Sequence, residues 1–135
     1  MMKRVKVFID KGTLKTLQED MERGCRYRKI DTLKKRMMFM FNFAELERLV
    51  SKTGVKAMTR SNISNPIIEF RLSEWEEKTI RLIQKEMLEK GYERREMSYA
   101  GVMRIMIRVY VANIKKKNTQ LQSDDLRFAC GSLDS

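Results

Sequence analysis

The sequence contains no histidine, and its two cysteines, Cys25 and Cys130, lie far apart in unrelated contexts. Zinc sites in proteins are built mainly from cysteine and histidine, so a site of this kind is nearly excluded, as is catalysis that depends on histidine. The chain also lacks a glycine-rich phosphate-binding loop and a convincing pair of carboxylates. We therefore expect no enzymatic activity, no metal and no cofactor, and we expect both thiols to be reduced.

Long apolar runs are absent as well. No stretch approaches the ~18 consecutive apolar residues that a membrane span requires. The N-terminal sequence MMKRVKVFID is too short and too charged for a secretory signal. These features predict no membrane partner and a cytoplasmic location. With 135 residues, 42% of them hydrophobic, the chain has material for one domain or for two small units that share a core.

Positive charge is what the chain has in excess. Its 29 lysines and arginines against 18 acidic residues give a formal charge of +11. Residues 1–64 hold 16 of the basic and 7 of the acidic side chains, whereas residues 118–135 hold only 1 and 3. An excess of this size favours a polyanionic partner such as a nucleic acid, because binding to phosphates releases their counterions.

The stretch NPIIEFRLSEWEEKTI, residues 65–80, changes its hydrophobic period halfway. Its first part alternates, which predicts a short strand with one apolar face. Ser73 followed by glutamates is typical of a helix start, and Gly91 is a natural helix end. Ser98 offers a second N-cap, before an apolar helix expected over residues 99–116. The apolar stripe of the first of these helices comprises Trp75, Thr79, Ile80, Ile83, Met87 and Leu88.

The same order of patterns occurs at the front of the chain. Apolar and polar residues alternate over residues 4–9, and Asp10 can cap a helix that ends at Gly24. A basic turn then leads to Asp31, which we expect to cap a second helix. The run MMFMFNF in that helix is expected to pack in the core, and the pattern permits the helix to continue to Val50.

Two short strands in one chain suggest how the halves combine. A lone strand of this length leaves its backbone groups unpaired, and pairing the two strands with each other would satisfy both. We therefore predict a mostly α fold with a two-stranded antiparallel ribbon, in which two similar halves share one core. The expected organisation is a first half at 1–53, a linker at 54–65, a second half at 66–117 and a flexible tail at 118–135.

This order of elements resembles the ribbon-helix-helix DNA-binding family, to which Arc and MetJ belong. The matching stretches are RVKVFIDKGTLKTL…ERGCRYRKIDTLKKRMMF and IIEFRLSEWEEKTI…EKGYERREMSYAGVMRIMI, which cover most of residues 3–112. Ordinary members contribute one strand per chain to a dimer. A chain with both halves is similar to the TraY proteins of conjugative plasmids and to the T-DNA border accessory proteins of tumour-inducing plasmids. The resemblance implies two ribbon-helix-helix repeats fused in one monomer with internal pseudo-twofold symmetry.

The resemblance also implies which residues would contact DNA. In this family the ribbon enters the major groove of double-stranded DNA, and its outward side chains contact base edges. By position, the base-reading residues are Arg4, Lys6, Phe8, Ile67, Glu69 and Arg71. Phosphate binding is implied at the start of each second helix and in the turn before it. That set comprises Arg26, Arg28, Lys29, Asp31, Thr32, Arg94, Arg95, Ser98 and Tyr99.

Simpler interpretations and other functions compete with this one. Glu69 could form a cross-strand ion pair with Arg4 or Lys6, and the basic turns could be ordinary solvated loops. A DNA-binding chain could act beside a relaxase or another DNA-processing protein in plasmid transfer, or it could regulate transcription as a repressor, an autoregulator or an antitoxin. From another class, the chain could be a protein-interaction module that homodimerises through its C-terminal half.

Overall fold

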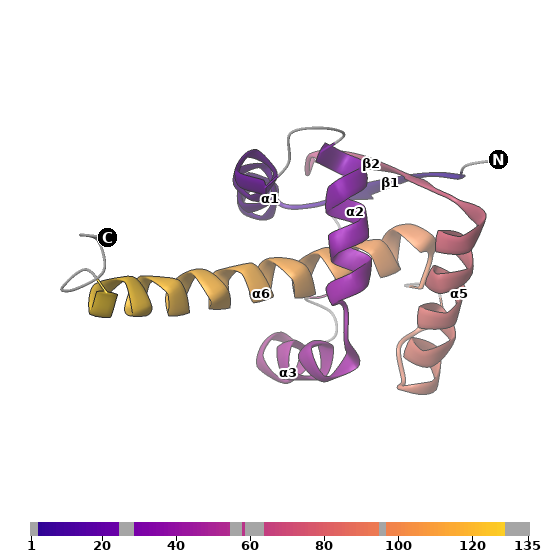
Figure 1. Cartoon of the computed structure of the whole chain (residues 1–135). Coiled ribbons are helices and arrows are strands. Elements are labelled where there is room, and N and C mark those ends of the chain that lie inside the picture. The colour runs from indigo at the N-terminus through magenta and orange to yellow at the C-terminus, as the bar shows by residue number, and fades with distance from the viewer. Residues whose placement is uncertain (1–2, 25–28, 55–57, 59–63, 95–96, 129–135) are drawn as a thin grey trace.

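The computed structural model describes residues 3–24, 29–54, 58, 64–94 and 97–128, and of residues 23–24, 29 and 117–128 it describes only the backbone. The fold is mostly helical with one two-stranded antiparallel sheet, which confirms the predicted fold class (Figure 1). The elements in chain order are β1 (Lys3–Phe8), α1 (Lys11–Gly24), α2 (Lys29–Met40), α3 (Phe43–Thr53), β2 (Ile67–Leu72), α5 (Glu74–Glu89) and α6 (Tyr99–Phe128).

The two strands pair with each other within the chain. Val5 lies opposite Phe70 and Val7 opposite Ile68, and all four side chains are buried. A two-stranded sheet is marginal by itself in water, so this one depends on the helices beneath its apolar face. The alternating pattern in the sequence therefore predicted both the strands and their inward faces.

The helices cross between the halves of the chain. α2 contacts β2 and α6, while α6 contacts β1 and α5, so each of these two helices packs against the strand of the other half. Figure 1 shows α6 passing beneath the ribbon as the longest element of the molecule. The buried apolar side chains that the structure describes belong to one cluster, in which α6 supplies Val102, Met103, Ile105, Met106, Ile107, Val109, Tyr110 and Val111.

The predicted helix starts at Asp10 and Ser73 and the predicted helix end at Gly91 are confirmed. The Ser73 hydroxyl accepts from the Glu76 amide at 3.3 Å and the Glu76 carboxylate accepts from the Ser73 amide at 2.9 Å, which is a complete capping box. The Asp10 carboxylate accepts from the Thr13 amide at 3.0 Å. Gly91 has φ 103° and follows the last turn of α5, in the left-handed conformation that favours glycine.

Asn42 ends the expected long helix of the first half. α2 begins at Lys29, so Asp31 lies inside the first turn rather than at the cap. α2 then stops at Met40, and the Asn42 side chain accepts from the Glu45 amide as the N-cap of α3. The helix therefore does not continue to Val50, as the pattern permitted, because an asparagine that caps a new helix interrupts the apolar run.

The last helix also differs from its expected length. α6 continues to Phe128, past the helix end near Lys116 and through most of the expected tail. No glycine or proline occurs between Gly101 and Gly131, so a helix nucleated in the core has no residue that stops it. At 1.5 Å per residue, its 30 residues span about 45 Å.

Most of the expected linker, 54–65, lies outside the described residues, but Met58 within it is buried in the core. Among the helices that the structure describes, none combines the length and the hydropathy needed to cross a membrane.

Candidate nucleic-acid interface

One face of the ribbon points away from the helices. It carries the six residues expected to read bases, which are Arg4, Lys6, Phe8, Ile67, Glu69 and Arg71. Five of these six are exposed, and Phe8 is partly buried. The strand alternation therefore predicted that all six side chains point away from the core, and the pairing of the strands brings them together in two adjacent rows.

Two of these residues form an ion pair in the free protein. Arg4 Nε lies 3.6 Å from Glu69 Oε1, and both side chains are well exposed. This contact is the simpler interpretation of Glu69 that the sequence left open. An exposed pair of this kind contributes little to stability, so it can exchange for a contact with a ligand at small cost.

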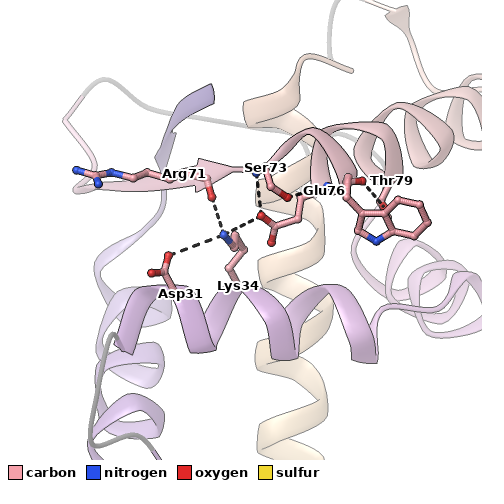
Figure 2. Close-up of polar contacts among 7 residues, drawn as sticks. Asp31, Lys34, Arg71, Ser73, Glu76 and Thr79 are labelled. Atoms are coloured by element: carbon pink, nitrogen blue, oxygen red, sulfur yellow. Dashed lines mark hydrogen bonds and ion pairs between the residues drawn. The ribbon is translucent and has the colours of Figure 1, made fainter. Parts of the chain in front are cut away.

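The backbone of Arg71 is hydrogen-bonded to α2, whereas its side chain is exposed to solvent. Its carbonyl oxygen accepts a hydrogen bond of 2.6 Å from Lys34 Nζ of α2. Figure 2 shows the guanidinium of Arg71 pointing away from both α2 and α5. Among the described residues, no acidic group pairs with this guanidinium, so its donors are available on the outer face of the ribbon.

Lys34 is the buried centre of this arrangement. Only 3% of its side chain is exposed, and its ammonium lies 2.9 Å from Glu76 Oε1 and 3.8 Å from Asp31 Oδ1 (Figure 2). Partial burial alone would raise the pKa of Glu76, but the hydrogen bonds from Ser73 and Lys34 outweigh burial and lower the pKa below its usual value. One cation thus joins α2, the end of β2 and the start of α5.

Arg104 of the second half ties a helix to a strand in the same way. Its Nε donates to the carbonyl of Phe8 at 3.0 Å, so α6 is tied to the end of β1 as α2 is tied to the end of β2. Lys34 lies five residues after the first residue of α2, and Arg104 lies five residues after the first residue of α6. The two buried cations therefore occupy the same place in their helices.

The start of α6 lies beside the start of β1. Lys3 Nζ sits 4.4 Å from the centroid of the Tyr99 ring. The phenol of Tyr99 binds Arg81 and Glu77 of α5, and the Ser98 hydroxyl caps the Gly101 amide at 3.1 Å. Because the side chains of Ser98 and Tyr99 already have partners, a phosphate contact in the first turn itself would come from backbone amides other than that of Gly101.

The start of α2 lies towards the opposite end of the ribbon. Both figures show α2 beginning beside the start of β2. Thr32 lies in the first turn together with the Asp31 carboxylate. Of the other expected phosphate-binding residues, Arg94 is exposed, whereas Arg26, Arg28, Arg95 and the side chain of Lys29 lie outside what the structure describes.

An open cleft separates α2 from the start of α5. Its volume is about 890 Å³, and its rim carries Phe39 and Trp75, which are 89% and 77% exposed. The sequence placed both aromatic rings in the core, and this expectation is wrong. At the cleft wall the charges of Lys34 and Glu76 already satisfy each other, which leaves no free buried charge to orient a small ligand.

Sequence reasoning missed Lys34 and Arg104 as organising residues. Both had a detectable signal, because each interrupts an otherwise apolar stripe. Lys34 shares a helical face with Leu33 and Met37, and Arg104 lies within the run VMRIMI. A cation at such a position must find a partner in the core, and here the partner is a strand carbonyl.

No protein-family model, curated protein or solved structure matches this chain.

Proposed function

We propose that this chain binds double-stranded DNA sequence-specifically, by inserting the ribbon of β1 and β2 into the major groove. One observation carries the proposal: strands 59 residues or more apart in sequence pair within one chain, with six side chains rich in charge on the face opposite the core. A two-stranded ribbon is one of the few elements that the major groove admits. The formal charge of +11 supplies the non-specific attraction to phosphate.

The remaining parts of the molecule are consistent with this use. The starts of α2 and α6 lie towards opposite ends of the ribbon, where backbone amides could hold the DNA backbone on either side. The matched positions of Lys34 and Arg104 favour two fused ribbon-helix-helix repeats in one monomer. We propose that the chain acts without catalysis, as an accessory factor beside a relaxase or another DNA-processing protein in plasmid or T-DNA transfer.

Arg71→Ala tests the base-reading role. After selection of a cognate duplex from a random pool, the variant should lose ~1–3 kcal/mol of affinity for that duplex and little for random DNA. Lys85→Ala is the matched control, because it removes one exposed positive charge from α5 and leaves the ribbon intact. Equal losses on cognate and random duplexes in the Arg71 variant would contradict base reading.

Arg94→Ala tests the phosphate-binding role. This exposed side chain lies in the turn before α6, so its loss should weaken binding to all duplexes and lower the dependence of log K on log salt by about one ion. Fluorescence anisotropy at several salt concentrations measures the slope. An unchanged slope would remove Arg94 from the interface. A wild-type chain that binds no duplex at all would overturn the proposed function.

A further inference from the structure

The register of the ribbon makes its two ends chemically different. Arg4 lies opposite Arg71 at one end, and Phe8 lies opposite Ile67 at the other. The central pair is Lys6 opposite Glu69. The sequence gives the outward residues of each strand, but only the register shows that like side chains face each other across the ribbon.

The two ends also differ in what they offer a ligand. Arg4 and Arg71 are like charges directly opposite each other, which is an unfavourable pair that the diagonal contact of Arg4 with Glu69 offsets only in part. At the other end Ile67 is 51% exposed beside the partly buried Phe8. Phe8 and Ile67 stabilise the ribbon as a cross-strand pair, and the apolar surface that they leave exposed would gain from covering an apolar group on a ligand.

We propose, on the basis of the proposed function, that the ribbon binds DNA in a single orientation and reads a polar site. The Arg4–Arg71 end would contact guanines, whose O6 and N7 atoms accept from arginine. The Phe8–Ile67 end would contact thymine methyl groups, which are the apolar groups of the major groove.

The spacing of the two ends follows from strand geometry. Arg4 and Phe8 are four residues apart on one strand, which corresponds to about 13 Å at a rise of about 3.3 Å per residue. Base pairs are stacked about 3.4 Å apart along the duplex. Because the major groove is inclined to the duplex axis, the guanine-containing and thymine-containing parts of the site should be centred at most about four base pairs apart.

The flanks of the ribbon add to this polarity. At the Arg4 end, Lys3 covers the Tyr99 ring beside the start of α6, whose first turn contains no acidic residue. The first turn of α2, towards the other end, contains Asp31, which weakens the attraction of that helix end for phosphate. Among the described residues, the stronger phosphate contact is thus expected on the guanine side.

Selection of bound sites from a random duplex pool tests the orientation, with three chains compared: wild type, Arg71→Leu and Ile67→Asn. The wild type should select a non-palindromic motif with guanine on one side and thymine on the other. Arg71→Leu should lose preference only at the guanine side, by about 10- to 100-fold per discriminated base. Ile67→Asn should lose preference only at the thymine side.

Two results would overturn the polar site while leaving the proposed function in place. One is a palindromic motif selected by the wild type. The other is a loss at the same base positions in both variants. A failure to select any duplex would instead overturn DNA binding itself. Circular dichroism of each variant checks that the fold is retained, and both substitutions lie at exposed positions.

Discussion

In each half of the molecule a buried cation donates a hydrogen bond to a strand carbonyl, but the charges around the two cations differ. In the first half, buried Lys34 donates to a strand carbonyl and also pairs with the carboxylate of Glu76. In the second half, buried Arg104 donates to the carbonyl of Phe8 beside another cation, Arg108. Burial and the charge of Arg108 both lower the pKa of Arg104. In the first half a carboxylate contacts the buried cation directly, whereas in the second half the carboxylate of Asp10 acts on the neighbouring Arg108.

This difference shows what holds each strand. The end of β2 is tied by Lys34 to α2 and, through Glu76, to the capping box of α5. The end of β1 is tied to α6 by a hydrogen bond from Arg104, and burial and the nearby charge of Arg108 disfavour the charged form of that donor. We therefore expect the free energy of unfolding to depend more strongly on Lys34 than on Arg104.

The largest effect is expected from Lys34→Met. The change leaves the carboxylate of Glu76 partly buried without its cation and the Arg71 carbonyl without its donor. Removing one partner of a buried pair is costly, so the free energy of unfolding should fall by about 4 kcal/mol. Urea denaturation measures the loss, and Lys35→Met at the exposed neighbouring position should change it by less than about 0.5 kcal/mol.

The pH dependence of this pair has a definite sign. The pKa of Glu76 in the folded chain lies below its usual value of 4.5, so the pairing of Glu76 stabilises the fold above that pH, and this stabilisation is lost as the pH falls through the folded pKa. The stability difference between wild type and Lys34→Met should therefore shrink on acidification. A difference that stays constant down to acid unfolding would show that the pair with Glu76 is not its source.

A smaller effect is expected from Arg104→Met. The substitution removes the hydrogen bond to the Phe8 carbonyl, but it also removes a charge that is disfavoured by burial and by Arg108. The loss should be about 2 kcal/mol in the same urea experiment. A loss equal to or greater than that of Lys34→Met would reverse the comparison between the two halves.

Much of the ribbon and its helix ends could be predicted from local sequence. Alternation over six residues gave both strands and their inward faces, because the side-chain period of a strand is two. Ser73 and Gly91 marked a helix start and a helix end, because capping depends on residues close in sequence. The outward face of the candidate site followed from the same alternation.

The parts that could not be predicted depend on residues far apart in the chain. The register that places Arg4 opposite Arg71 is set by contacts between the halves, since nothing within one strand specifies it. Phe39 and Trp75 were expected in the core from their residue type, but they lie where no other described element covers them. The partners of Lys34 could not be predicted from its neighbours in sequence, because Arg71 and Glu76 belong to the other half.

Two glycines provide a finer comparison between the first helices of the halves. Gly91 follows α5 with φ 103°, so Gly91→Ala should lower the free energy of unfolding by about 1–2 kcal/mol through backbone strain. Gly12 lies in the first turn of α1, where an added Cβ would meet only Asp10 Oδ2 at 3.4 Å. Gly12→Ala should therefore be neutral or slightly stabilising. Equal losses in the two variants would contradict the role of positive φ at Gly91.

The smallest effect is expected at the break that distinguishes α2 and α3 from the uninterrupted α6. Asn42→Ala removes the oxygen that accepts from the Glu45 amide at 2.8 Å, and it should lower the free energy of unfolding by about 1 kcal/mol. Asn42→Asp keeps an accepting oxygen at the N-cap and should retain most of that stability. Urea denaturation measures both changes, and far-ultraviolet circular dichroism follows helix content. If Asn42→Ala gained helix without losing stability, α2 and α3 would have merged. The break would then depend on this one side chain rather than on the packing of α3 against α6.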